Sequence, residues 1–244
     1  MGARFSFYAI IQHVSRKELR VAQEITSLSE IMNVDKKAVI RRNAFSLLME
    51  QGYAKTSYAN IAQRSGCNRS LVQYYYPKKS QILIDFVERL IECSYDFMML
   101  RHAESGNCFL DFFVTGQIHF YVLLKNPPLE PLTRDIVANR ETSSAIIALL
   151  ADWQHHHSGV EGIDSNVMLD SITFAMGGAY EYVYRCLADD QEIDVGALLS
   201  RTIRAYIVGL EVDPASFDAD KNSFRLDAGF LTQANEYVLE HLLH

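Results

Sequence analysis

The sequence predicts an all-α protein, with a small N-terminal module of three helices in front of a larger helical body. Five prolines and twelve glycines are few for 244 residues, and this sparse supply of helix breakers leaves room for long helices. Apolar residues recur every third or fourth position along most of the chain, as they do in amphipathic helices. From residue 107 onward, no segment shows the convincing alternation of apolar and polar residues that is typical of a β-strand.

Composition and charge are those of a soluble globular protein whose basic residues are concentrated in one block. Apolar residues make up 49% and charged residues 22%, and no stretch approaches the roughly 18 apolar residues needed to cross a bilayer. The net charge is −7, yet residues 36–92 carry ten basic and four acidic side chains, whereas residues 93–244 carry nine and twenty-two. This block favours a local site for a polyanion, with chance clustering on a solvated surface as the alternative.

The cysteines and the N-terminal residues are consistent with a reducing compartment. Cys67, Cys93, Cys108 and Cys186 form no CxxC or CxH pair, so their spacing predicts neither a zinc site nor a redox pair. The apolar run Phe5–Ile11 is short and no small-residue cleavage site follows it, so we expect no secretory signal. These features predict a cytoplasmic protein without a membrane partner.

Residues 1–34 form an extension to which the sequence assigns no role. Within it, Glu18–Met32 has the periodicity of a helix. Arg4–Val14 is aromatic and apolar and could pair as a strand or cover a neighbouring core. Because so apolar a stretch seldom stays exposed, we expect Phe5, Phe7, Ile10 and Ile11 to pack on the body.

Regular helical signals begin at Asp35, which is a plausible N-cap for a helix that Gly52 ends. Thr56 or Ser57 can then cap a short helix over Tyr58–Arg64. The next elements are a tight turn at Ser65-Gly66, a second short helix over Arg69–Tyr76 capped by Asn68 and stopped by Pro77, and a longer helix from about Lys79 toward Met99. Further helices are expected at about 107–125, 130–152, 165–188, 194–211 and 223–243.

Two short helices joined by a glycine turn, behind a longer helix, have the form of a helix-turn-helix. Such a unit places its second helix in the major groove of DNA while the first crosses the backbone. Gly66 permits the sharp turn, and Ala62 is small where the two helices cross. The basic block coincides with this unit, so shape and charge independently indicate DNA binding.

Residues 36–92 resemble the DNA-binding domain of the TetR family of transcriptional regulators. The matching string is Ala44-Phe45, Gly52-Tyr53, Thr56-Ser57, Ile61-Ala62, Ser65-Gly66, Leu71-Val72, Tyr75-Tyr76-Pro77-Lys78-Lys79 and Ile82-Leu83. The resemblance implies an extension at 1–34, a DNA-binding domain at 35–82, and a helical ligand-binding and dimerisation domain at 83–244. The last part carries no motif of its own and rests on analogy.

The resemblance also implies which side chains touch DNA. The residues expected to face base edges are Arg69, Ser70, Leu71, Gln73 and Tyr74. Those expected to hold phosphates are Thr56, Ser57, Tyr58, Tyr75 and Lys79. Most family members carry a tyrosine where this chain has Gln73, and glutamine can bond adenine N6 and N7, so a different operator is expected. The alternative for the tyrosine run is core packing, which we expect for Tyr76.

Two further patterns were considered as catalytic or metal sites. Consecutive helical residues point about 100° apart, so His155-His156-His157 is better explained as a solvated helix end than as a metal site. The chain has no GxSxG, no HExxH and no glycine-rich phosphate loop. We therefore expect no enzyme activity, no metal and no cofactor.

Apolar stripes on the segments 165–188 and 194–211 could be internal core, but in the resembling family two such helices per subunit form a four-helix bundle between subunits. The stripe residues assigned to a dimer interface are Ile172, Ala175, Ala179, Tyr182, Leu199 and Tyr206. The residues that could line a ligand cavity, each of them equally a core residue, are Phe97, Phe112, Phe113, His119, Tyr121, Trp153, Phe174 and Tyr180.

Together these features predict a homodimeric, ligand-responsive transcriptional regulator that binds a palindromic operator in double-stranded DNA. Repression that ends when a small-molecule effector enters the body is the expected action, with activation left open. The alternative is a helical interaction or structural protein whose helix-turn-helix does not read DNA.

Overall fold

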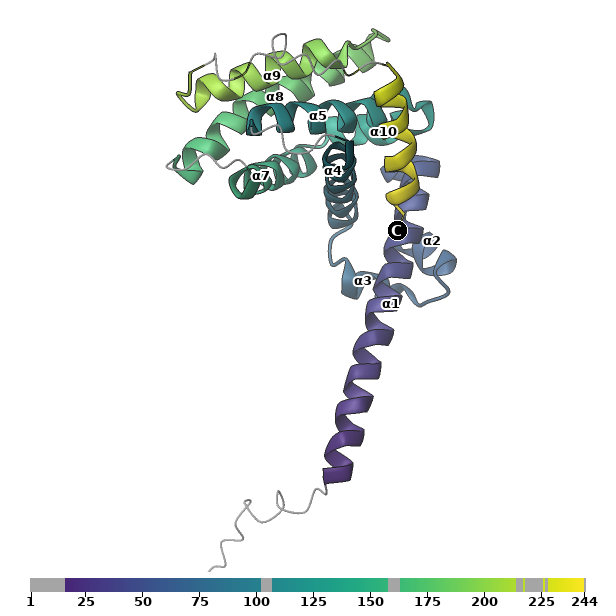
Figure 1. Cartoon of the computed structure of the whole chain (residues 1–244). Coiled ribbons are helices and arrows are strands. Elements are labelled where there is room, and N and C mark those ends of the chain that lie inside the picture. The colour runs from purple at the N-terminus through teal and green to yellow at the C-terminus, as the bar shows by residue number, and fades with distance from the viewer. Residues whose placement is uncertain are drawn as a thin grey trace, which may run out of the picture.

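The computed structural model describes residues 16–101, 107–157, 163–213, 217, 226 and 228–243, and all regular elements in these ranges are helical. The prediction of an all-α protein is confirmed. A small module of three helices is attached to a larger helical body (Figure 1). The elements are α1 (Arg16–Lys55), α2 (Tyr58–Arg64), α3 (Arg69–Tyr75), α4 (Ser80–Arg101), α5 (Cys108–Lys125), the 3₁₀ helix η3 (Pro127–Leu129), α6 (Glu130–Ala138), α7 (Arg140–His157), α8 (Ser165–Ala188), α9 (Val195–Gly209) and α10 (Ala228–His241).

The helix expected over 130–152 is two helices. Asn139, with φ −94° and ψ 109°, separates α6 from α7. Its side-chain oxygen accepts a hydrogen bond of 3.0 Å from the backbone N–H of Thr142 and so caps the start of α7. A lone asparagine is a weak helix breaker, and for this reason the apolar periodicity of the sequence predicts a single helix through Asn139.

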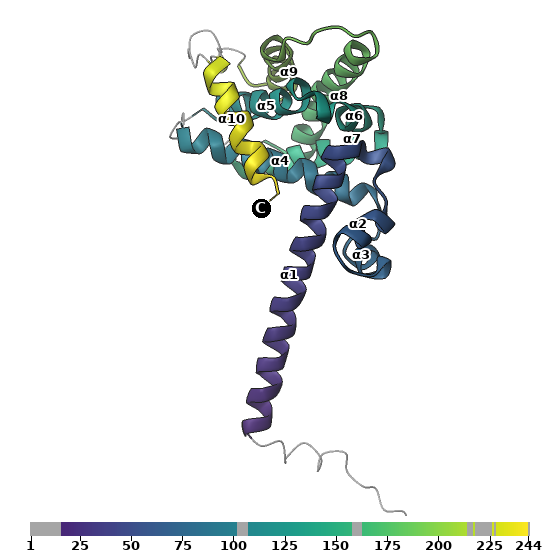
Figure 2. The same cartoon turned by 90° about the vertical axis from the view of Figure 1, so that its right-hand side faces the viewer.

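The helix α1 is longer than expected. The predicted helix over Glu18–Met32 is confirmed, but the predicted N-cap at Asp35 is wrong, because α1 continues through that position. Neither glycine nor proline lies between Glu18 and Gln51, so nothing in the chain interrupts the helix there. The N-terminal part of α1 projects away from the body, past α2 and α3 (Figures 1 and 2). The apolar residues Phe5–Ile11 lie outside the described residues.

Gly52 breaks α1 just before its last residues. Its φ of 77° and ψ of 172° lie in a region that residues with a Cβ rarely adopt. A Cβ at Gly52 would also lie 3.3 Å from the Cβ of Pro131 in α6. The body therefore packs tightly against the point where the chain turns from α1 toward α2.

The core is continuous from the module into the body. Phe45 of α1 and Phe86 of α4 are both fully buried, with their rings edge to face at a centroid distance of 5.3 Å. Further along α4, Ile91 and Phe97 are buried within the body. One helix thus contributes to the packing of both parts, and α5, α7 and α10 of the body pack against it (Figures 1 and 2).

Candidate nucleic-acid interface

The helix-turn-helix is built by local hydrogen bonds that the sequence predicts. Ser57 is the N-cap of α2: its hydroxyl oxygen accepts from the N–H of Asn60, and its own N–H donates to the Asn60 side chain at 2.9 Å. Gly66 adopts a φ of 62° in the turn. Asn68 caps α3 by accepting from the N–H of Leu71 at 2.9 Å. The predicted caps at Ser57 and Asn68 and the glycine turn are confirmed.

One face of α3 is free for a partner. Arg69, Ser70, Gln73 and Tyr74 are exposed, and Tyr74 keeps 76% of its surface in solvent. An exposed tyrosine of this extent does not support the core-packing alternative for Tyr74. Their contacts with base edges stay a prediction, which this exposure permits.

The opposite face of α3 holds the module together. Val72 and Tyr76 are buried, and the Tyr76 hydroxyl donates to the Asp85 carboxylate of α4. The core-packing expectation for Tyr76 is confirmed. Leu71 and Tyr75 are only partly buried and pack against the core, so each combines packing with an accessible edge. Burial and the hydrogen bond to Asp85 raise the pKa of Tyr76 well above its usual range.

Two of the side chains expected to contact phosphates form hydrogen bonds inside the protein. Thr56 is 1% exposed, and its hydroxyl donates at 2.8 Å to the carbonyl of Gly52. The expected phosphate contact of the Thr56 side chain is therefore wrong, because that side chain stabilises the Gly52 turn. The hydroxyl of Tyr58 donates at 2.8 Å to the carbonyl of Tyr76 and so joins α2 to the end of α3. A phosphate oxygen needs a donor, and the donor of Tyr58 is already engaged.

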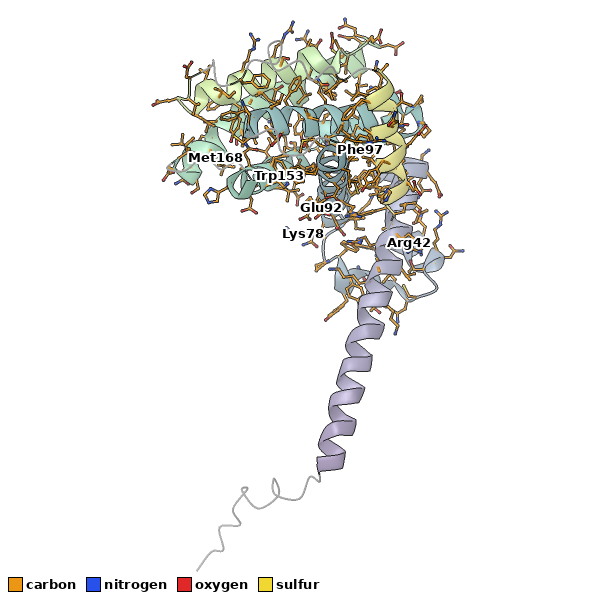
Figure 3. All side chains as sticks on the ribbon, viewed as in Figure 1. Arg42, Lys78, Glu92, Phe97, Trp153 and Met168 are labelled. Atoms are coloured by element: carbon orange, nitrogen blue, oxygen red, sulfur yellow. The ribbon has the colours of Figure 1, made fainter. Side chains whose placement is uncertain are left out.

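Several cations of the basic block are also partnered. Arg64 forms an ion pair with Glu50 at 2.7 Å. The ammonium of Lys79 lies 4.1 Å from the centroid of the Tyr53 ring, and partial burial lowers the pKa of Lys79. Lys78, labelled in Figure 3, is exposed and lies 4.0 Å from Glu141. An ammonium has three donors, so a phosphate contact of Lys79 stays a prediction.

Hydrogen bonds join the body to the module at the Gly52 turn. A carboxylate oxygen of Asp135 in α6 accepts hydrogen bonds from the backbone N–H groups of Tyr53 at 3.0 Å and Ala54 at 3.3 Å. These are the residues that lead into α2. Sequence reasoning missed Asp135, since one acidic residue on an amphipathic helix carries no signal of a partner about 80 positions away.

A second pair of hydrogen bonds joins α1 and α4 to the end of α10. The guanidinium of Arg42, labelled on α1 in Figure 3, donates at 3.1 Å to the carbonyl of Leu243. Arg89 of α4 donates at 3.3 Å to the carbonyl of His241. The last carbonyls of a helix have no partner within it, and cations suit them. The two arginines therefore fasten the end of α10 to α1 of the module and to α4.

Within the body, α4, α5, α7, α8 and α9 line an apolar cavity of about 30 Å³, more than the roughly 10–15 Å³ that a water needs. Of the eight candidate ligand residues, Phe112, His119 and Trp153 line it. The cavity also touches Ile91 and Met176, plain apolar helical residues that no sequence signal separates from the rest of the core.

The other five candidates lie elsewhere. Phe97 packs against Phe230 and Tyr237, and Phe113 packs against Phe217. Tyr180 is buried beside a different groove, between α7 and α8, and Tyr121 is on α5 without lining the cavity. Phe174 is 86% exposed on the outer side of α8. The assignment of these residues to one cavity is corrected: helical periodicity marks apolar residues without saying which of them face the same space.

The apolar stripes of α8 and α9 divide into two sets. Ile172, Leu199 and Tyr206 are at most 4% exposed within one chain, so the internal-core alternative holds for them. Ala175 and Ala179 are also buried, but they form the floor of an outer groove of about 470 Å³ between α8 and α9. The exposed rim of that groove includes Phe174, Gly178 and Tyr182.

Metal and membrane sites find no support in the described part of the chain. No group of three or more His, Cys, Asp or Glu side chains there could hold a metal ion, and the side chains of His156 and His157 lie outside it. None of the helices searched is both long and apolar enough to span a bilayer.

The fold and the exposed α3 face define a DNA-binding transcriptional regulator. Residues 40–86 match the family model described as bacterial regulatory proteins, tetR family. This match lies within the helix-turn-helix module and the start of α4, and it does not extend over the rest of the body. No curated protein matches the sequence.

Solved structures similar to the chain include two regulators. One is TylP, a TetR regulator from Streptomyces fradiae, with 14% identity and a TM-score of 0.44 over 84% of this chain and 98% of that one. Another is FadR, a fatty acid degradation regulator from Bacillus halodurans, with 18% identity and a TM-score of 0.40 over 73% and 97%.

Proposed function

We propose that the protein is a homodimeric repressor that leaves a palindromic operator when a small molecule enters its body. The observation that carries this proposal is the exposed face of α3, with Arg69, Gln73 and Tyr74, on a module that matches the TetR family. Arginine reads guanine and glutamine reads adenine through paired hydrogen bonds in the major groove. A face of this kind is suited to base recognition.

Dimerisation is supported by the outer face of α8 and α9. Phe174 and Val208 keep 86% and 61% of their surfaces exposed, and Tyr182 keeps 42%. Large apolar side chains gathered in one place mark an interaction surface. A second copy related by a two-fold axis would cover this face and place two α3 helices at half-sites about one turn of DNA apart.

Release of DNA can be transmitted through α4 and α6. Ile91 of α4 touches the cavity, while Phe86 of the same helix packs against Phe45 in the module. Asp135 of α6 holds the residues that lead into α2. A molecule that parts the cavity walls would displace α4 and change the spacing of the two α3 helices. The coupling is reciprocal, so operator DNA must weaken binding of that molecule by the same factor.

The proposal is tested by selecting duplexes from a random library on the purified protein. The expected result is enrichment of one sequence with two-fold symmetry, bound at least about 10³-fold more tightly than a scrambled duplex. Transcription from a promoter that overlaps this sequence should then fall when the protein is added; a rise would indicate an activator. If no sequence were enriched, the alternative of a helical interaction protein would take the place of the regulator.

Replacing Asp135 with alanine should loosen the grip of α6 on the module. Hydrogen bonds to a charged acceptor contribute about 1.5–3 kcal/mol, so amide hydrogen exchange at Tyr53 and Ala54 should accelerate by about tenfold or more. Glu236→Ala on the exposed side of α10 is a matched control that should change neither rate. Unchanged protection at both amides in Asp135→Ala would show that the packing of Pro131 on Gly52 suffices to hold the turn.

A further inference from the structure

A buried histidine in the cavity wall has one ring nitrogen without a hydrogen-bond partner in the described residues. His119 lies on α5 in the cavity wall, and its Nδ1 atom is out of contact with solvent and with any hydrogen-bond partner in the described residues. A buried polar atom left without a partner destabilises the folded state. Burial lowers the pKa of His119 to about 4, so the imidazole is neutral near pH 7. A bound molecule could supply the missing hydrogen bond.

The rest of the cavity wall offers aromatic and aliphatic surface. Phe112, Phe120 and Trp153 contribute rings. The two threonine hydroxyls in the wall are already engaged, Thr115 with a methionine sulfur at 3.9 Å and Thr202 with a carbonyl of its own helix at 2.9 Å. The lining residues include no lysine, arginine, aspartate or glutamate. A charged group placed here would be desolvated without an opposite charge to compensate it.

We propose that this cavity binds a small, uncharged aromatic molecule through one hydroxyl-type group that hydrogen-bonds to His119. The inference concerns binding; that such a molecule is also the effector rests on the function proposed above. A hydroxyl can donate or accept, so it suits either tautomer of the imidazole. The class excludes carboxylates and amines that are charged at neutral pH.

The cavity must widen to admit such a molecule, because about 30 Å³ is well below the roughly 150 Å³ of a cavity that binds benzene. One part of the wall is the crossing of α5 and α9. A Cβ at Gly116 would lie 2.7 Å from the Cδ1 atom of Leu199, so the Leu199 side chain closes on α5 at this glycine. Rotation of one flexible leucine side chain is the smallest movement that enlarges the space beside His119.

The chain carries its own reporter for the test. Trp153 is the single tryptophan of the sequence and lines the cavity, so its fluorescence should respond to a bound molecule. The probes are phenol, benzene, benzoate and benzylammonium, which share one ring and differ in the hydroxyl and the charge. We expect saturable changes with phenol, binding of benzene about three- to tenfold weaker, and no saturation with either ion.

Three variants distinguish loss of the hydrogen bond to His119 from a general effect on folding. His119→Leu should bind phenol no better than benzene and should melt at a higher temperature than the native protein, since it removes the unpaired atom. His155→Leu, on the exposed side of α7, is the matched control and should keep the preference for phenol. Leu199→Ala enlarges the cavity and should bind phenol and benzene more tightly while keeping the preference.

Three results would overturn the inference: benzoate or benzylammonium binding as tightly as phenol, equal binding of phenol and benzene to the native protein, or no binding of phenol to either the native protein or Leu199→Ala. The selected operator duplex is titrated separately with and without phenol. Binding of phenol without release of DNA would leave the site standing and contradict the ligand-released repressor. Release of DNA by phenol with no change at Trp153 would place the effector elsewhere.

Discussion

A glutamate in place of Gly178 should convert the protein to a monomer that binds its operator about a hundredfold more weakly or worse. A Cβ at Gly178 meets nothing within 4 Å in the chain, so the fold tolerates the substitution. In the proposed dimer the same carboxylate would be buried against the partner between Phe174 and Tyr182, where its desolvation outweighs pairing with Arg201 of the same groove. Loss of the second half-site removes the avidity of paired binding, which is worth about 10²–10⁴.

The neighbouring glycine supplies the control. Gly177 is also open to solvent on α8, but it lies about 100° around the helix, beside the groove that faces α7. Gly177→Glu and Gly178→Glu gain the same helix propensity, so a difference between them reports the surface and not the helix. Light scattering gives the mass and fluorescence anisotropy the affinity. If Gly178→Glu stayed dimeric with native affinity, the partner would have to bind at a different face.

Removing a side chain that reads bases should weaken the free energy of operator binding by about 1–3 kcal/mol and relax the base preference at one position of the operator. This is expected for Arg69→Ala and Gln73→Ala, whose exposed side chains are free to reach base edges. Lys79→Ala should instead weaken cognate and scrambled duplexes about equally and reduce the salt slope by about one, because a phosphate contact carries no sequence information. The measurement is a salt titration of affinity for both duplexes with each variant.

Two controls are needed to interpret the effect of Lys79→Ala. Lys79 also packs on the ring of Tyr53, so the melting temperature of Lys79→Ala must be measured beside its affinity. The exposed neighbour Lys78 gives a matched substitution without that ring contact. Altered base preference in Lys79→Ala, together with unaltered preference in Arg69→Ala and Gln73→Ala, would contradict the placement of α3 in the groove.

The helix-turn-helix could be predicted closely because its determinants are local. The caps at Ser57 and Asn68 and the turn at Gly66 each act within three or four residues, a range that a sequence pattern covers. The role of Thr56 could not be predicted in the same way. Its hydroxyl donates to the carbonyl of Gly52 and its side chain is 1% exposed, and that burial depends on the packing around the turn, which no local pattern contains.

The body shows the limit of periodicity. The sequence predicts apolar stripes that contain Ile172 on α8 and Tyr206 on α9, but a period of 3.6 residues does not tell whether an apolar face meets its own chain or another. The same ambiguity placed exposed Phe174 among the cavity candidates. Phe112, His119 and Trp153 do line the cavity, but nothing in the sequence separated them from the other candidates, each of which was equally a core residue.

The path of α4 makes the two parts of the molecule one cooperative unit. Phe86 completes the core of the module, and Ile91, five residues later and about 7.5 Å further along the helix, belongs to the wall of the cavity. A cut at the boundary expected between residues 82 and 83 would fall inside this helix and leave each half without part of its packing. A chimaeric regulator that joins the module of one protein to the body of another would therefore need all of α4 from a single parent, together with the α6 residues that contact Gly52.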